Sequence, residues 1–154
     1  MAIDRIDWHW DSAEKIYRER HSVIGELTEE QQNQISLLAG NHIGLFLRWI
    51  IENHFEGDDA DQMECEKVRC GEISGTEYLL NDCDGKFWDQ DVTADIIPFV
   101  KSYYEGSDYL IDYTNCCLPD DVQCYDIITN DDDYFKLRTM IDKAFNAFKT
   151  HNSL

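Results

Sequence analysis

The chain has 154 residues, which is the size of one folded domain. Hydrophobic residues make up 43% of it and aromatic residues 12%, so the composition is not that of a disordered acidic tail. Its formal net charge is −19, and a chain with so few basic side chains is poorly suited to bind nucleic-acid phosphates or anionic lipids. We therefore expect a single acidic domain over residues 1–154 with no direct nucleic-acid or membrane partner.

The negative charge is concentrated in the middle of the chain. Residues 57–133 contain 21 acidic residues and only 4 basic ones, whereas residues 134–154 contain 4 basic residues and one acidic residue. An acidic surface of this kind favours encounter with a basic protein, because opposite charges accelerate association. The alternative is that the charge serves only solubility.

The sequence also predicts a cytoplasmic protein. Its first residues contain no apolar stretch typical of a secretory signal. The longest apolar run, residues 43–51, contains Arg48 and is far shorter than the ~20 residues that span a bilayer. In a reducing compartment the six cysteines are expected to be free thiols.

Helical signals dominate the first half of the chain. A short helix is expected from about Asp11 to Arg20. Thr28 and Gln31 have the spacing of a capping box, and apolar residues then recur at helical intervals, which predicts a long helix over Glu29–Phe55. Gly40 and Gly44 lie one turn apart on the same face of this helix. Since glycine is costly inside a helix, they indicate either a close helix–helix contact or a kink.

The second half is also mainly helical. Residues 107–118 fit a helix and a strand equally well, whereas residues 122–128 are predicted to form a strand. Further helices are expected at 59–69, 74–84, 94–105 and from the acidic cap 131–133 to the end of the chain. The predicted fold class is mainly α, with five to seven helices around a long central one and at most a small β element near residues 122–128. The residues expected to be buried are Leu38, Leu45, Phe46, Trp49, Leu79, Phe99, Ile141 and Phe145.

No metal site or cofactor site is predicted. Residues 81–85 resemble the start of a calcium loop, but Leu80 occupies the first ligand position, so an Asp-Gly turn is the preferred interpretation. The cysteines contain no Cys-x2-Cys pair, and no His-x3-5-His pair accompanies them. We therefore expect no stoichiometric zinc and six reduced thiols at positions 65, 70, 83, 116, 117 and 124.

No catalytic residue is predicted either, which favours a non-enzymatic protein. Ser74 lacks the Gly-x-Ser-x-Gly setting of a hydrolase nucleophile, and no cysteine carries a local catalytic signature. His42 is interpreted as a hydrogen-bonded core histidine, with Trp8, His9, Trp10 and His42 as a candidate ligand pocket. The candidate partner-binding carboxylates, whose alternative role is as solvated caps, are Asp82, Asp84, Asp89, Asp91, Asp131, Asp132 and Asp133.

Four segments of the sequence carry a family resemblance. They are residues 42–49 (HIGLFLRW), residues 83–91 (CDGKFWDQD) and the pair Tyr103-Tyr104, with the pattern of the terminal helix from Tyr134 to Phe148 as a fourth. In these segments the chain resembles a family of small acidic bacterial proteins classed as a domain of unknown function. The resemblance implies a bacterial cytoplasmic protein and transfers no catalytic residue. In size and charge alone, the chain is also similar to immunity proteins that block basic toxins.

Two functional hypotheses follow. The first is a non-enzymatic protein-binding module, similar to an immunity protein, that uses an acidic face against a basic partner. The second is a small-molecule-binding protein or enzyme with a pocket near the histidines and tryptophans of the first two helices. Sequence spacing does not decide between them.

Overall fold

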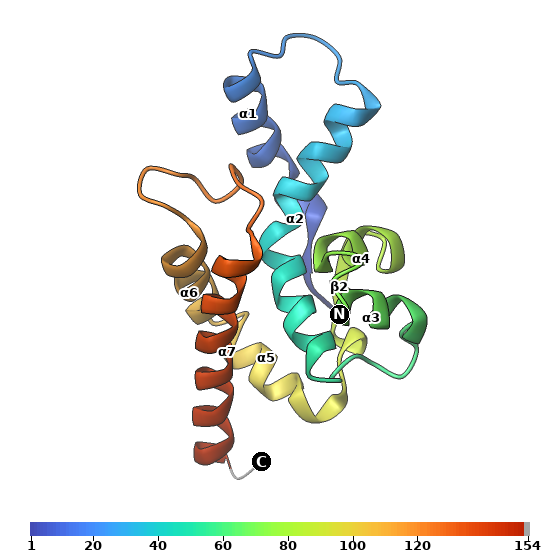
Figure 1. Ribbon diagram of the computed structural model, residues 1–154, viewed down its shortest axis with the longest axis vertical. Coiled ribbons are helices and arrows are strands. Elements are labelled where there is room, and N and C mark those ends of the chain that lie inside the picture. Colours follow the sequence, from blue (N-terminus) through green and yellow to red (C-terminus); the bar gives the residue numbers. More distant parts are fainter. Residues whose placement is uncertain (153–154) are drawn as a thin grey trace.

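The computed structural model of the chain describes residues 1–152 and shows a mainly helical fold with one small sheet (Figure 1). The predicted fold class, with its long central helix, is therefore confirmed. No helix in the described part of the chain combines the length and apolar character needed to cross a membrane. The helices within residues 1–152 are α1 (Trp10–His21), α2 (Glu29–Glu52), α3 (Gln62–Arg69), α4 (Gly75–Asp82), α5 (Ile97–Tyr103), α6 (Asp108–Cys117) and α7 (Asp131–Asn152).

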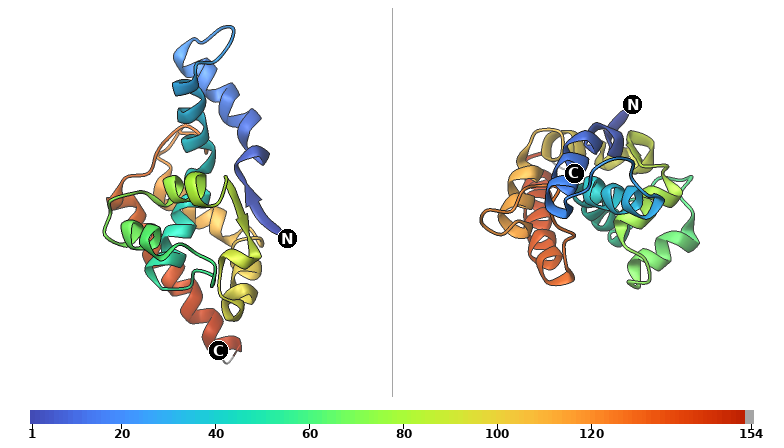
Figure 2. Two further views of the ribbon diagram at one scale, coloured as in Figure 1. Left: turned by 90° about the vertical axis from the view of Figure 1, so that its right-hand side faces the viewer. Right: turned by 90° about the horizontal axis from the view of Figure 1, so that it is seen from above.

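Helix α2 is the centre of the structure. It begins with the predicted capping box, in which the Gln31 backbone N–H donates to the Thr28 hydroxyl and the Thr28 N–H donates to the Gln31 side chain. All residues from 39 to 47 are buried, as expected for a helix that is covered on every side. Helices α3 and α4 lie on one side of α2, and α6 and α7 lie on the other (Figures 1 and 2).

Gly44 allows the backbones of α2 and α4 to touch. A Cβ atom on Gly44 would lie 2.1 Å from the Thr76 hydroxyl oxygen and 2.4 Å from the Thr76 backbone nitrogen. A Cβ on Gly75 would lie 1.9 Å from the Gly44 carbonyl oxygen. The close helix–helix contact is therefore the correct explanation of Gly44. At Gly40 a Cβ would instead meet the end of the Ile6 side chain, at 2.8 Å.

The small β element lies elsewhere than predicted. Strand β1 (Ala2–Arg5) pairs antiparallel with β2 (Lys86–Trp88), whereas residues 118–130 form turns and coil. The prediction of a strand at 122–128 was therefore wrong in position. A strand needs a neighbouring strand to satisfy its backbone, and this segment lies against helices; the side chain of Asn41 on α2 accepts from the Thr129 backbone N–H instead.

Burial confirms most of the predicted core. Of the eight residues named above, six are buried, and Leu38 and Phe145 are half-buried. The ambiguous residues 107–118 form α6, because Tyr109, Tyr113 and Cys117 recur every four residues and are all buried on one face. Segment 94–105 divides into a short 3₁₀ turn and α5.

The contact between α2 and α4 generates a stability prediction. Gly44→Ala should lower the free energy of unfolding by about 1–3 kcal/mol or more, because the new methyl group meets backbone atoms that cannot move aside. Gly40→Ala, in the same helix, should cost much less, since the flexible tip of Ile6 can shift and alanine favours the helix by up to about 1 kcal/mol. Urea unfolding followed by circular dichroism measures both; equal losses in the two variants would contradict this account.

Candidate functional site

Three side chains from separate elements meet beside α2. Asp4 comes from β1, His9 from the residue that precedes α1, and His42 from the middle of α2. One oxygen or nitrogen from each lies within 4.8 Å of the other two. The His9 Nε2 lies 2.6 Å from Asp4 Oδ1, and the His42 Nε2 lies 3.3 Å from Asp4 Oδ2. The two imidazole rings are edge to face, with centroids 4.5 Å apart.

Local structure brings each of these side chains inward. The pairing of β1 with β2 is irregular between Ala2 and Asp4, and the adjacent residues Ile3 and Asp4 are both buried. Such a bulge re-aims side chains that a regular strand would send to opposite faces. His9 ends a 3₁₀ turn and begins α1 at the same time, so the change of direction there fixes its ring. His42 is held by the fully buried part of α2.

The carboxylate of Asp4 is buried and surrounded by donors. The Arg5 backbone N–H donates to it at 2.8 Å and the Tyr104 hydroxyl at 2.7 Å, in addition to the two histidines. Burial alone would raise the pKa of Asp4, but the hydrogen bonds from His42, His9 and Tyr104 hold it well below its usual range. Asp4 is therefore ionised at neutral pH.

The two histidines differ in their second ring nitrogen. His9 Nδ1 lies 2.5 Å from the Tyr125 hydroxyl. His42 Nδ1 is buried and has no hydrogen-bond partner among the described residues. Burial lowers the pKa of His42 despite the attraction of Asp4, so the ring is neutral at pH 7. An unsatisfied buried nitrogen costs about 1–3 kcal/mol, which makes His42 Nδ1 the least satisfied atom of this cluster.

A pocket of about 310 Å³ opens on the cluster. Its other walls come from the start of α6, from Tyr104 after α5, and from Cys124 and Tyr125 in the irregular segment 118–130. Burial raises the pKa of Cys124 to about 11 and that of Tyr125 to about 12, so both are protonated at neutral pH. Cys124 is therefore poorly prepared to act as a nucleophile, since the thiolate is the reactive form.

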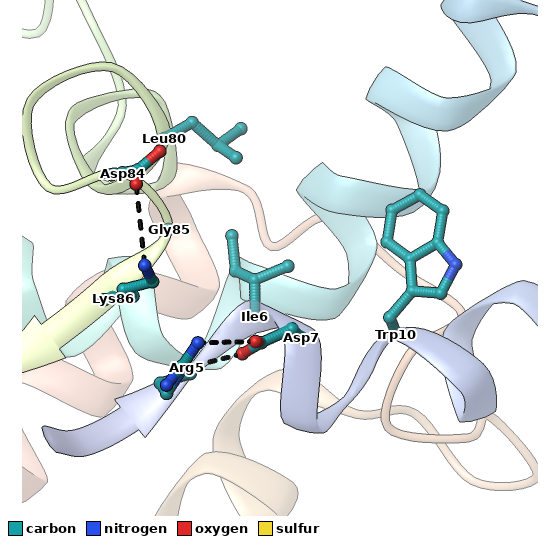
Figure 3. Close-up of a pocket in the computed structure, with 8 residues that line it drawn as sticks. All are labelled: Arg5, Ile6, Asp7, Trp10, Leu80, Asp84, Gly85 and Lys86. Atoms are coloured by element: carbon teal, nitrogen blue, oxygen red, sulfur yellow. Dashed lines mark hydrogen bonds and ion pairs between the residues drawn. The ribbon is translucent and has the colours of Figure 1, made fainter.

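The structure separates the four residues proposed for a pocket. His9 and His42 share the pocket just described, but Trp8 is 60% exposed and lies outside it. Trp10 lines a different, more open hollow of about 380 Å³ beside β1 and the turn that precedes β2 (Figure 3). In that hollow Arg5 is paired with Asp7 and Lys86 with Asp84, so its charges are already matched (Figure 3).

The acidic candidates do not form one face. Asp82, Asp84, Asp89 and Asp91 belong to α4 and the β2 region, and Asp131–Asp133 form the first turn of α7 across α2 (Figures 1 and 2). Several have partners of their own: Asp89 binds the amino group of Met1, Asp131 binds Arg48, and Asp133 binds Lys136. The cysteines are all free thiols, and none belongs to a group of three or more metal-ligand side chains within residues 1–152.

A comparison with protein families decides the relationship of the chain. Residues 2–127 match the model of a family described as a domain of unknown function, DUF7832. The chain belongs to this family. The match ends before α7, so the likeness of the terminal helix lies outside it, whereas every residue that lines the histidine pocket lies within it. Neither the curated proteins nor the solved structures contain a significant match.

Sequence analysis found two of the five residues that form the polar cluster of this site. His9 and His42 were named as pocket residues, but Asp4, Tyr104 and Tyr125 were not. Asp4 lies on a strand of four residues, which is too short to show an alternating pattern. Tyr125 reaches His9 across 116 positions of sequence, a distance that no local spacing rule covers. The available sequence signal was the position of Asp4 between Ile3 and Ile6, two apolar residues that are both buried in the structure.

The buried His42 generates a prediction about pH. In the unfolded chain its imidazole takes up a proton near pH 6.5, whereas the folded ring stays neutral because burial lowers its pKa. The unfolded state thus binds more protons below pH 6.5, and the free energy of unfolding should fall as pH decreases from 7.5 to 5.5, by at most about 1.4 kcal/mol per pH unit from this group. Urea titrations in metal-free buffer measure the slope.

Two variants assign that slope to a residue. His42→Gln should flatten it, whatever the stability of the variant at neutral pH. His54→Gln is the matched control, because the His54 side chain is 71% exposed and should leave the slope unchanged. An unchanged slope in His42→Gln would show that His42 is not the group that titrates.

Proposed function

We propose that this chain binds a small molecule in the pocket formed by Asp4, His9, His42 and Tyr125. The observation that carries the proposal is the convergence of a buried carboxylate and two imidazoles on a cavity of about 310 Å³. Ligand pockets combine apolar walls with a few polar groups that converge, and groups with shifted pKa values concentrate at such sites. Here the walls are aromatic and aliphatic, and Asp4 and His42 have lowered pKa values.

The cost of building this cluster supports a functional role. A buried carboxylate needs several donors, and Asp4 takes them from β1, from His9, from α2 and from Tyr104 after α5. Apolar residues in place of Asp4 and all of its partners together would fill the same volume with little or no loss of stability. The polar cluster is therefore explained better by a ligand than by stability. Whether the bound molecule is also transformed depends on its chemistry, and His9 is the group placed to exchange a proton with it.

The pocket can be closed without disturbing the core. Thr114 lines the pocket from the exposed surface of α6, and Asn115 is the next exposed residue and does not line it. Thr114→Trp should fill the mouth and abolish ligand binding, whereas Asn115→Trp should leave it intact. Nuclear magnetic resonance titrations of both variants and the natural chain, with a panel of amines, nucleosides, aromatic acids and imidazoles in the presence of a chelator, measure this.

The two variants give the titration a clear result. Binding to the natural chain and to Asn115→Trp, with at least a tenfold loss in Thr114→Trp, is the expected outcome. A panel that produces no shifts at residues lining the pocket, or shifts that persist in Thr114→Trp, would contradict the proposal.

A second candidate is a protein-binding module that recognises a basic partner, similar to an immunity protein. The observation that favours it is the net charge of −19, with Asp82 and Asp132 exposed and without an ion-pair partner among residues 1–152. The candidate carboxylates form two separate groups, so a partner would contact either the α4–β2 region or the start of α7. The free cysteines and the family resemblance support a bacterial cytoplasmic setting for either function.

The second candidate predicts a salt-dependent interaction. A basic protein that binds this chain should lose affinity steeply as ionic strength rises from 50 to about 500 mM, because exposed charges are screened over ~10 Å or less. Two double variants should identify which acidic group the partner contacts. One is Asp82→Asn with Asp84→Asn, and the other is Asp131→Asn with Asp132→Asn. Surface plasmon resonance measures both effects. An affinity that changes neither with ionic strength nor in either double variant would exclude this mode of binding.

A further inference from the structure

We propose that Asp4, His9 and His42 bind a divalent transition-metal ion, with the pocket supplying its open coordination positions. This inference deepens the proposed function, since it rests on the same pocket and names one component of what the pocket holds. It departs from the expectation of no stoichiometric zinc, which rested on the spacing of the cysteines, because the ligand set proposed here contains no cysteine. The ligand set is of a different kind and comes from three elements that are distant in sequence.

The distances between the three side chains suit a metal ion. Zinc binds imidazole nitrogen and carboxylate oxygen at about 2.0–2.2 Å, so neighbouring ligand atoms in a tetrahedral site lie about 3.3 Å apart. The separation of His42 Nε2 from Asp4 Oδ2 is 3.3 Å. His9 Nε2 is 2.6 Å from Asp4 Oδ1, a hydrogen-bond distance, and must move away from it by less than 1 Å. A rotation of the His9 ring, which is the most exposed of the three, provides that change.

The donor set selects the class of ion. Two imidazoles and one carboxylate suit zinc, iron and their neighbours, whereas calcium and magnesium prefer oxygen ligands alone. Both histidines must bind through an unprotonated nitrogen, and the neutral state of His42 at pH 7 is compatible with this. Asp4 is ionised and supplies one negative charge inside the site.

Neighbouring groups hold the ligands in place. When His9 binds through Nε2, its remaining proton lies on Nδ1, and the Tyr125 hydroxyl at 2.5 Å accepts it. The Tyr104 hydroxyl donates to Asp4 Oδ2 and the Arg5 backbone N–H donates to Asp4 Oδ1, so each carboxylate oxygen keeps a lone pair for the ion once the bond from His9 opens. His42 Nδ1, which no described group satisfies, is either a ligand itself or the carrier of the ring proton when Nε2 binds.

The pocket side of the cluster provides room for further ligands. Three protein ligands leave at least one coordination position, which is the pattern of catalytic rather than structural zinc sites. The pocket of about 310 Å³ lies against all three ligand residues, so water or a small molecule can reach the ion. A metal ion would also explain why a buried carboxylate is surrounded by imidazoles rather than by an arginine or lysine.

Metal uptake by the full chain tests this inference. The purified protein is stripped with a chelator, dialysed and titrated with ZnCl₂ and then with CoCl₂, with calorimetry and visible absorption as measurements. We expect one ion per chain and cobalt d–d bands without the near-ultraviolet charge-transfer band that thiolate ligands give. His9→Asn should weaken zinc binding at least tenfold, and His54→Asn, which alters an exposed histidine, should leave it unchanged.

A measurement on the unaltered chain guards against variants that fail to fold. Addition of ZnCl₂ to ¹⁵N-histidine-labelled protein should shift the imidazole nitrogens of two histidines and fix their tautomers. Shifts at His9 and His42 support the inference, whichever nitrogen of His42 is involved. Absence of stoichiometric binding, a thiolate band with cobalt, or equal affinity in His9→Asn and His54→Asn would overturn it.

The outcomes for the metal and for the small molecule are separable. The small-molecule titrations are made with chelator present, and the metal titrations are made without any organic ligand. Zinc binding that is lost in His9→Asn but kept in Thr114→Trp would support the metal site even if no organic molecule binds. Ligand binding in chelator, together with no zinc uptake, would overturn the metal site and leave the proposed pocket standing.

Discussion

The burial of one negative charge, that of Asp4, organises this end of the molecule. A carboxylate removed from water must be matched by donors, and here the donors come from four places: the backbone of β1, His9, α2 and Tyr104. Each donor fixes the position of the element that carries it. The N-terminal strand, the start of α1 and the end of α5 are thereby held against the middle of α2. Loss of the carboxylate would free all of them at once.

Local rules predicted the elements whose signals lie within a few residues. The capping boxes at Thr28 and Ser74 placed the starts of α2 and α4 correctly, because the hydrogen bonds involved join residues three apart. The sequence left a close helix–helix contact and a kink as explanations of Gly44, and the contact with Thr76 on α4 is the correct one. The strand at 2–5 was missed because four residues show no periodicity, and its partner lies more than 80 positions away.

Only the site residues on α2 and at the start of α1, His42 and His9, could be predicted from the sequence. His9 and His42 attracted attention as isolated histidines among aromatic and apolar residues. Their partners Asp4, Tyr104 and Tyr125 join them through contacts that depend on the path of the whole chain. The opposite error was made with the tryptophans, where closeness in sequence suggested one pocket. A helix start between Trp8 and Trp10 sends the two rings to different surroundings.

The two sides of the histidine pocket differ in construction. His42 belongs to a stretch of α2 that is buried on every side, whereas Cys124 and Tyr125 belong to thirteen residues without helix or strand, 118–130. That segment is tied in its second half by Asn41 to Thr129 and by Arg20 to Asp126. A ligand in the pocket would thus contact one rigid wall, formed by α2, and one less constrained wall, formed by the coil 118–130. The contacts with α2 would then determine which ligands bind, and the rate at which the coil 118–130 opens would determine how long a ligand stays bound.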